Sequence, residues 1–226
     1  MYTGIDCISL CRSFGNPPNE ILKSISFKIP KGQFVSVTGR SGSGKSTLLY
    51  ALSGLDTITS GQVLFSGESI HEMPEKKLNQ FRNFKMGFVF QFHYLLPEIN
   101  VLENVLMPAR KTNLHKAKEA DARKILEEFS LSHCIDKTPG QISGGESQRV
   151  SIARALIMQP EYIFADEPTG NLDSANGEKV LELFQKVNKE YQTTIVMVTH
   201  DTGYAKLAQR TICLSDGYLE SDTLNK

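Results

Sequence analysis

The stretch Gly39-Arg40-Ser41-Gly42-Ser43-Gly44-Lys45-Ser46-Thr47 is the most specific pattern in this chain. It matches G-x-x-x-x-G-K-[ST], the phosphate-binding P-loop. Glycines allow positive φ and a close approach of the backbone to a phosphate, and consecutive N–H groups then form a nest for an anion. Lys45 is expected to reach the β- and γ-phosphates, and Ser46 to offer its hydroxyl to Mg²⁺. The stretch therefore predicts a bound nucleotide, but not what the nucleotide is used for.

The residues on either side of this loop support the prediction. Gln33–Thr38 is a short β-rich run that ends at the loop, and Leu48–Leu52 continues as a helix whose N-terminus would face the phosphates. The alternative is a surface turn rich in glycine and serine. The strand before the loop, the helix after it and the Lys-Ser-Thr run all disfavour that alternative.

Composition and charge narrow the class of protein. The 226 residues are enough for one large domain or two small ones, and 25 Lys and Arg residues balance 25 Asp and Glu residues. A neutral chain has no global basic field, so we expect no nucleic-acid partner. The apolar runs are far shorter than a membrane span, and no signal-peptide pattern is evident. We therefore expect any membrane role to come through a partner.

The four cysteines show no pattern of a metal site or a disulfide framework. They form no CxxC pair and have no histidine at zinc-ligand spacing; they are Cys7, Cys11, Cys134 and Cys213. We expect them to be reduced, partly buried thiols of a cytosolic protein. His133 is expected on the surface or in a loop, like the histidines His71, His93 and His115.

Strand and helix patterns alternate along most of the chain. Short β-rich runs occur at Ile21–Ile29, Gly61–Gly67, Met86–Phe90, Tyr162–Ala165 and Thr194–Thr199. Gly177–Glu190 has the period of a helix, with its apolar face formed by Val180, Leu183, Phe184 and Val187. Together with the P-loop, this alternation predicts an α/β fold with a mainly parallel sheet and helices on both faces.

The middle of the chain differs, because residues 92–158 have few strand signals and are mostly helical in pattern. Within them, 115–130 is a helix whose expected apolar face is Ala117, Ala120, Ile125 and Phe129. We predict one domain over residues 1–226. Its core and β subdomain would span about 1–91 and 159–226, and an inserted helical subdomain about 92–158.

An acidic pair follows the apolar run at Tyr162–Ala165. A buried strand that delivers Asp166 at its carboxyl end matches the second half of a P-loop NTPase site, where this carboxylate supports Mg²⁺ opposite Ser46. Glu167 is then placed to orient or deprotonate the attacking water. The alternative is a solvated acidic pair, which the P-loop makes much less favourable.

A second candidate anion site is Ile142-Ser143-Gly144-Gly145-Glu146, ahead of the helical run Arg149–Leu156. Its Ser-Gly-Gly at a helix start supplies N–H groups and the positive end of the helix dipole. The alternative is a flexible linker with a helix cap. One nucleotide does not need two such sites from one chain, but in a dimer each subunit could close over the nucleotide of the other.

At this point the chain resembles the nucleotide-binding subunit of an ATP-binding cassette (ABC) transporter. Residues 142–146 resemble the family signature Leu-Ser-Gly-Gly-Gln, with changes at the first and last positions. The resemblance implies γ-phosphate contacts from Ser143, Gly144 and Gly145. It also implies a P-loop NTPase core with an N-terminal antiparallel β subdomain, ATP and Mg²⁺ as cofactors, and a head-to-tail dimer.

Other family elements follow in the expected order. Gln91 resembles the glutamine that links Mg²⁺ and the attacking water to the membrane partner, and Asn171-Leu172-Asp173-Ser174 resembles the loop that crosses to the opposite subunit. His200 matches the switch histidine that contacts the γ-phosphate. Phe14 is the residue expected to stack on adenine, although a lone phenylalanine is more often part of a core. The resemblance thus implies catalytic roles for Glu167, His200, Lys45 and Gln91, and metal contacts from Ser46, Gln91 and Asp166.

Two longer stretches suggest a branch of the family. Residues 92–105 and 165–173 resemble the ATPases of the lipoprotein-releasing and macrolide-exporter type. This implies an ATPase that powers integral-membrane subunits by ATP-driven dimer closure, in lipoprotein release or mechanotransmission-type export. Its location would be peripheral, at the cytoplasmic face of the inner (plasma) membrane. We expect Leu95, Leu96, Val101 and Leu102 to dock the membrane partner, the alternative being ordinary helical core.

Two other functions fit the sequence less well. A non-transport ABC ATPase with a nucleic-acid or ribosomal partner would carry a second cassette, a coiled coil or a zinc insertion, none of which this sequence shows. A P-loop kinase would leave Ser143, Glu167 and His200 without a purpose. A transport ATPase therefore remains the favoured interpretation.

Overall fold

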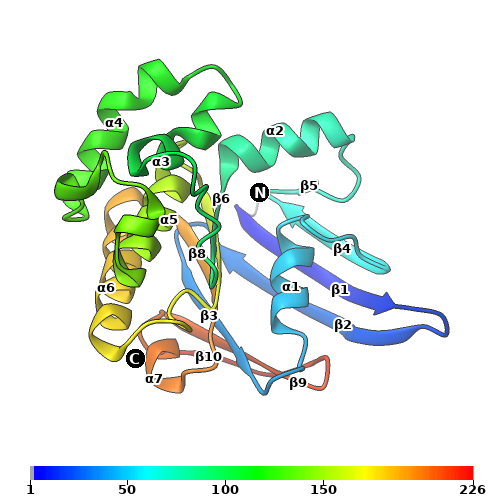
Figure 1. Cartoon of the computed structure of the whole chain (residues 1–226). Coiled ribbons are helices and arrows are strands. Elements are labelled where there is room, and N and C mark those ends of the chain that lie inside the picture. The colour runs from blue at the N-terminus through cyan, green and yellow to red at the C-terminus, as the bar shows by residue number, and fades with distance from the viewer. Residues whose placement is uncertain (1–2, 226) are drawn as a thin grey trace.

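Two β-sheets with helices packed around them form the molecule (Figure 1), and a computed structural model describes residues 3–225. The smaller sheet is antiparallel with the order β2-β1-β4-β5; its strands are β1 (Gly4–Phe14), β2 (Asn19–Pro30), β4 (Ser60–Phe65) and β5 (Glu68–Ser69). The larger sheet has the order β10-β9-β3-β8-β7-β6; its strands are β3 (Phe34–Gly39), β6 (Met86–Phe90), β7 (Tyr162–Asp166), β8 (Thr194–Val198), β9 (Arg210–Ser215) and β10 (Tyr218–Leu224). In that sheet only the pair β9–β10 of the described strands is antiparallel. The predicted α/β fold with a mainly parallel sheet and an N-terminal antiparallel sheet is confirmed.

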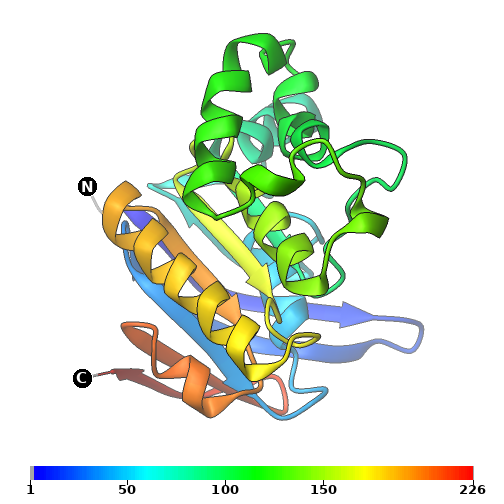
Figure 2. The same ribbon diagram turned by 60° about the vertical axis from the view of Figure 1, so that its left-hand side comes forward.

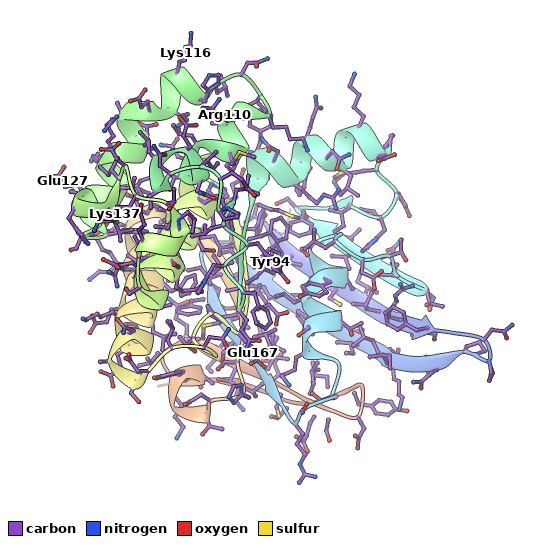
Figure 3. All side chains as sticks on the ribbon, in the orientation of Figure 1. Tyr94, Arg110, Lys116, Glu127, Lys137 and Glu167 are labelled. Atoms are coloured by element: carbon purple, nitrogen blue, oxygen red, sulfur yellow. The ribbon has the colours of Figure 1, made fainter. Side chains whose placement is uncertain are left out.

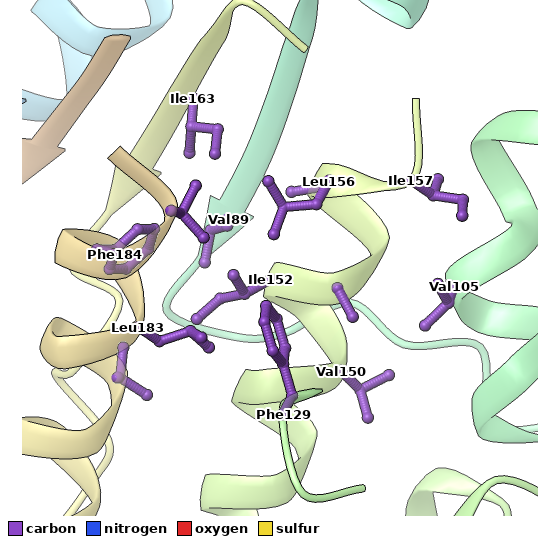
Figure 4. Close-up of a cluster of buried hydrophobic side chains, with 14 of the residues drawn as sticks. Val89, Val105, Phe129, Val150, Ile152, Leu156, Ile157, Ile163, Leu183 and Phe184 are labelled. Carbon is purple, nitrogen blue, oxygen red and sulfur yellow. The ribbon is translucent and has the colours of Figure 1, made fainter. Parts of the chain in front are cut away.

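The central strands β3, β7 and β8 of the larger sheet are buried on both faces, and each face of the sheet has its own core. Successive residues alternate between the two cores: Phe34 and Ile163 face one, whereas Val35 and Phe164 face the other. Helix α1 (Lys45–Leu52) and the antiparallel sheet pack on the second face, and α6 (Ser174–Tyr191) covers the first. Figure 4 shows Phe184 of α6 meeting side chains of β6, β7 and the helix α5 (Gly144–Leu156).

Residues 92–158 contribute α3 (Val101–Arg110), α4 (His115–Glu128) and α5, together with the short 3-10 turns η1 (Ser132–Cys134) and η2 (Pro139–Gln141). These helices group at one end of the molecule, away from the antiparallel sheet (Figure 2). The expected apolar face of the helix at 115–130 is confirmed for Ile125 and Phe129, which pack in or against the core, but was wrong for Ala117 and Ala120, which are exposed. Ala122 and Leu126 are buried instead. Two alanines carry too little apolar area to decide how a helix turns. The subdomain boundaries at 92 and 158 stay a prediction.

The elements not predicted from the sequence include strand β1, helix α2 (Glu75–Lys85) and the hairpin β9–β10. Helix α2 interrupts the β-rich first third; none of its residues is fully buried, and its side chains Leu78 and Phe81 pack half-buried against the core. The hairpin β9–β10 forms the edge of the larger sheet, and the outer strand β10 is mostly exposed. A last short helix, α7 (Thr202–Ala205), follows β8. Among the described helices, none is both long and apolar enough to cross a bilayer.

Candidate functional site

The carboxyl ends of four adjacent strands bring the predicted site residues to one edge of the larger sheet. The P-loop follows β3, His200 follows β8, Glu167 follows β7 and Gln91 follows β6. Ligands of open parallel sheets bind at this edge, since the loops that leave neighbouring strands meet there. Figure 3 shows Glu167 at these strand ends, on the same side as α1.

A cavity of about 620 Å³ lies at this edge. Its lining combines an aromatic side chain, the P-loop and two residues that follow the strands: Phe14, Ile21, Ser41, Gly42, Gly44, Lys45, Ser46, Thr47, Glu167 and His200. Residues far apart in the sequence thus meet in one space, as the motif pattern predicted. The lining, taken from residues 3–225, leaves out Gln91, Asp173 and the segment 143–145.

Two glycines are required by the shape of the loop. Gly39 has φ +143°, and a Cβ atom there would lie 2.2 Å from the carbonyl oxygen of Leu214. Gly44 has φ +98° at the N-cap of α1, where a Cβ would meet the side chain of Leu22 at 2.9 Å. Both conformations are strained for any residue with a side chain. The backbone can therefore turn tightly into the start of α1.

The loop holds buried donors that face inward. Lys45 is only 7% exposed, and its ammonium group donates to the carbonyl oxygen of Arg40 at 2.9 Å. Ser43 is also buried, and its hydroxyl has no hydrogen-bond partner among the described residues. A buried cation and an unpartnered hydroxyl beside a helix N-terminus fit a phosphate group.

The oxygens expected to hold Mg²⁺ lie together. The Ser46 hydroxyl donates to Oδ1 of Asp166 at 2.9 Å, and the Tyr50 hydroxyl donates to Oδ2 of the same carboxylate at 2.7 Å. Hydroxyl and carboxylate oxygens are ligands that Mg²⁺ prefers, so this donor set fits the ion. Mg²⁺ itself stays a prediction.

Tyr50 was missed by the sequence analysis. Burial raises the pKa of its hydroxyl, and the hydrogen bond to Asp166 raises it further, so the group stays a donor to that carboxylate. It lies four residues after Ser46 on the same face of α1, and this spacing is the signal that could have identified it.

Glu167 and His200 form a pair at the open side of the cavity. Nδ1 of His200 lies 3.0 Å from Oε2 of Glu167, which is within hydrogen-bond reach. Glu167 has φ +45°, a left-handed conformation that is uncommon outside glycine, and its N–H donates to the carbonyl oxygen of Val198 at 3.0 Å. The neighbouring strand therefore holds the backbone of Glu167 in a strained turn that presents its carboxylate to the cavity.

Two predicted residues are held by other partners. The Gln91 side chain donates from Nε2 to Oδ1 of Asn171 at 3.2 Å, and the Asn171 amide donates to the carbonyl oxygen of Gln91 at 3.1 Å. Asp173 caps α6, and its carboxylate accepts from the backbone N–H and from Nδ2 of Asn176, both at 2.8 Å. The structure thus joins the segments after β6 and β7, and the assigned contacts of Gln91 and Asp173 with the nucleotide stay predictions.

The segment Ser143–Gly145 starts α5, outside the cavity. Ser143 and Gly144 are exposed, whereas Gly145 is buried, and a Cβ on it would lie 2.7 Å from Oδ1 of Asn176. Ser143 and Glu146 form a capping box, in which each side chain accepts from the backbone N–H of the other residue. The N–H and hydroxyl of Ser143 lower the pKa of Glu146 to about 2, so the residue at the last signature position is a carboxylate.

Phe14 lines the cavity and is 43% exposed, as a base-stacking residue requires. The guanidinium of Arg12 lies over its ring, 4.2 Å from the centroid. Arg12 is itself fixed by two hydrogen bonds to Asp56, of 2.9 and 2.7 Å. Neither Arg12 nor Asp56 was expected at the site. Arg12 lies on β1 and Asp56 in a turn after α1, and no local pattern in the sequence links these two segments.

A second hollow, of about 500 Å³, lies between α2, β6, α3 and α5, and its lining includes Leu55, Arg82, Phe90, Tyr94 and Arg154. The guanidinium of Arg154 donates to the carbonyl oxygens of Tyr94 and His93 at 2.6 and 2.5 Å. Phe92 and Tyr94 are each 65% exposed, and Leu96 is 41% exposed. The expectation for Val101 and Leu102 was wrong, because both are buried in the core, as their place on the inner face of α3 requires.

Comparisons with known proteins agree with this geometry. The profile of the ABC transporter family matches residues 22–170. The lipoprotein-releasing system ATP-binding protein LolD of Leptospira interrogans is 50% identical over 219 residues, covering 97% of this chain and 92% of that protein. LolD of Aquifex aeolicus is 52% identical over 200 residues, 88% of each chain.

Solved structures give the same picture. The dimeric ATP-binding cassette MJ0796, in a post-hydrolysis state bound to ADP and Pi, superposes with a TM-score of 0.87 at 35% identity, covering 98% of this chain and 99% of that one. MJ0796 is described as a bacterial ABC transporter cassette, so the solved structure to which this chain is similar is a transporter ATPase.

Proposed function

This chain belongs to the ABC transporter family as an ATPase, and on that premise we propose that it is the ATP-hydrolysing subunit of a lipoprotein-releasing transporter. The observation that carries the proposal is the meeting of the P-loop, Glu167 and His200 around one cavity of about 620 Å³. The identity to LolD proteins over nearly the whole chain supports the cargo class.

ATP binding rests on the P-loop. The N–H groups at the start of α1 and the ammonium of Lys45 would hold the β- and γ-phosphates, with Lys45 exchanging its bond to the carbonyl of Arg40 for the phosphate. Phe14 would stack on the base at the other end of the same cavity. Ser46 and Asp166 would hold Mg²⁺, which when bound neutralises charge on the phosphates.

Hydrolysis rests on the pair of Glu167 and His200. Glu167 would take a proton from the attacking water, since its carboxylate lines the cavity from the strained turn after β7. His200 would keep that carboxylate oriented through the 3.0 Å contact and would donate to the γ-phosphate as it leaves. Lys45 would stabilise the charge that develops on the transferred group.

The second half of the site would come from another copy of the chain. Ser143 and Gly144 are exposed and lie outside the cavity that holds the P-loop, which suits contact with a nucleotide bound elsewhere. In a head-to-tail dimer they would meet the γ-phosphate on the partner. ADP lacks this group, so only ATP would favour the closed dimer, and hydrolysis would reopen it.

The membrane subunits would bind at the hollow beside Tyr94. The exposed Tyr94 and the half-buried Phe88 and Phe90 line a cavity of about 500 Å³ there, and such a surface fits an inserted helix of a partner. The adjoining pair Gln91–Asn171 would link that surface to the nucleotide edge. The chain would thus sit peripherally on the cytoplasmic face of the inner membrane.

Reconstitution tests the function. The chain and its membrane subunits in lipid vesicles should release a lipidated protein to a soluble acceptor when ATP is supplied. The Glu167→Gln variant should bind ATP but release almost nothing, whereas the matched surface variant Glu127→Gln should behave like the unaltered chain. ATP-driven transport of a small molecule without lipoprotein release would overturn the cargo class, and undiminished turnover in Glu167→Gln would overturn the proposed base.

A further inference from the structure

A hydrogen-bonded chain links His133, Glu146 and Ser143. Nε2 of His133, in η1, donates to Oε1 of Glu146 at 2.6 Å. The other oxygen of that carboxylate, Oε2, accepts from the N–H and from the hydroxyl of Ser143, both at 2.7 Å. The carboxylate is therefore shared between a side chain from a separate segment and the serine at the start of α5.

This sharing bears on what Ser143 can do. Its hydroxyl is donated to Glu146, whereas the proposed function requires it to be donated to a γ-phosphate on the partner chain. The carboxylate also places a negative charge next to the point where a multiply charged phosphate would arrive. The carboxylate and the phosphate would repel each other, and the positive end of the α5 dipole would offset this repulsion only in part.

His133 donates a hydrogen bond to Oε1 of Glu146, the carboxylate oxygen that does not contact Ser143. Its N–H weakens the hold of Glu146 on Ser143, because a carboxylate that accepts a second strong donor is a poorer acceptor for the first. It also reduces the effective negative charge that faces the phosphate. His133 is more than half exposed, so it can do this without disturbing the core.

The cluster could be taken for a metal site, because the donor atoms of His133, Cys134 and Glu146 all lie within 4.8 Å of one another. The hydrogen bonds oppose that interpretation. The Cys134 thiol is buried and donates to the carbonyl oxygen of Leu131 at 3.2 Å, and burial raises its pKa. Both oxygens of Glu146 are also occupied by donors of the protein.

We propose that His133 is a positioning residue for ATP-driven closure, acting through Glu146 to free the Ser143 hydroxyl for the partner's γ-phosphate; this inference rests on the proposed function. It assigns a role to a residue outside the signature itself. The role concerns closure and turnover, not the binding of ATP by the P-loop of the same chain.

The test measures the ATP concentration for half-maximal dimer formation in the Glu167→Gln background, where hydrolysis does not reopen the dimer. His133→Ala should raise that concentration about fivefold or more, the lower end of usual coupling between sites. Binding of ATP to the monomer should change less than twofold. His133→Gln, which restores an N–H donor, should recover most of the loss, and the control variant His115→Ala should show none.

A second background separates positioning from a structural effect. When Glu146→Gln removes the charge, adding His133→Ala should change closure less than twofold. An equal loss in both backgrounds would mean that His133 only supports the fold, and no loss in the first background would mean that it has no role; either result overturns the inference alone. A Glu167→Gln chain that fails to dimerise with ATP would instead overturn the proposed function, and the inference with it.

Discussion

The P-loop and the signature segment both place serine and glycine at the start of a helix, yet their helix ends differ. Helix α1 has Gly44 at its N-cap position, and no side chain of residues 3–225 caps it. Helix α5 has Ser143 at its N-cap position, and the carboxylate of Glu146 already occupies its first turn. The free N–H groups of α1 can take up a ligand anion, whereas α5 has an anion of its own.

Motif similarity alone therefore does not make two equal phosphate sites. The P-loop combines an open helix start with a buried ammonium group, so it can bind phosphate by itself. The signature segment is exposed and internally satisfied, so it suits a phosphate that is already held by other groups. Five variants test this division between a binding half and a closing half.

Glu167→Gln should have the largest effect, a fall in kcat of about 1000-fold, since a general base contributes within this range. ATP affinity should stay within a few-fold, because the change leaves the P-loop intact. Single-turnover hydrolysis with an equilibrium ATP titration measures both. A kcat within tenfold of the unaltered chain would show that catalysis does not lie on the binding half.

Lys45→Ala should weaken ATP binding about 100-fold, because it removes a buried charge-assisted contact to the phosphates. Calorimetric titration of the monomer measures this. Lys116→Ala, an exposed lysine on α4, is the control and should bind normally. Affinity within threefold of normal would show that the P-loop is not the binding half.

Ser143→Arg should reduce ATP-dependent dimer formation at least tenfold while leaving ATP binding to the monomer unchanged. A bulky cation at an exposed N-cap blocks the approach of a second chain without touching the cavity. Size-exclusion chromatography with light scattering in the Glu167→Gln background gives the measurement, with Ser221→Arg on β10 as control. A dimer that still forms would place the closing half elsewhere.

Glu146→Gln should remove about 1 kcal/mol of the free energy of unfolding that the unaltered chain loses on acidification. The folded-state pKa of Glu146, about 2, lies below its usual value of 4.5, so its ionised form stabilises the fold fully above pH 4.5. That contribution is lost as pH falls from 4.5 through about 2. Denaturant titrations at several pH values should show a steeper acid loss for the unaltered chain than for the variant. Parallel curves would mean that the capping box adds no charge-dependent stability.

Arg12→Ala should have the smallest effect, a rise of about threefold in the KM for ATP with kcat unchanged. It removes the cation over one face of Phe14, a contact of modest strength at an exposed ring. Arg123→Ala on α4 provides the control. An unchanged KM would separate Phe14 from the binding half, and a fall in kcat would assign Arg12 to another step.

The sequence was most informative where structure is local. Short patterns predicted the P-loop, the strand before it, the strand that ends at Asp166, and the helix 174–191. The meeting of Glu167, His200 and Lys45 follows from parallel strands that end at one edge of the sheet. What could not be predicted depends on contacts between distant segments. Arg12 meets Asp56, and His133 meets Glu146, through loops whose path no periodicity describes.

Which residues are buried was also hard to predict from the sequence, because burial too depends on contacts between distant segments. Val101 and Leu102 were expected to face a partner, but packing of α3 against α5 takes both into the core. Helix α2 was not predicted, because its apolar side chains Leu78 and Phe81 are only half-buried and most of its other residues are polar. Apolar residues in a sequence indicate that a surface is covered. Only the tertiary structure shows whether the same chain or a partner covers it.

Gly145 packs closely on the side chain of Asn176, so the starts of α5 and α6 lie against each other. Asp173 is hydrogen-bonded to the same asparagine, which places Ser143 and Asp173 on neighbouring helix starts. A second chain that meets one of these segments therefore meets the other in the same encounter. Association should then follow a single kinetic phase, and a slow step after contact would have to arise from a different part of the molecule.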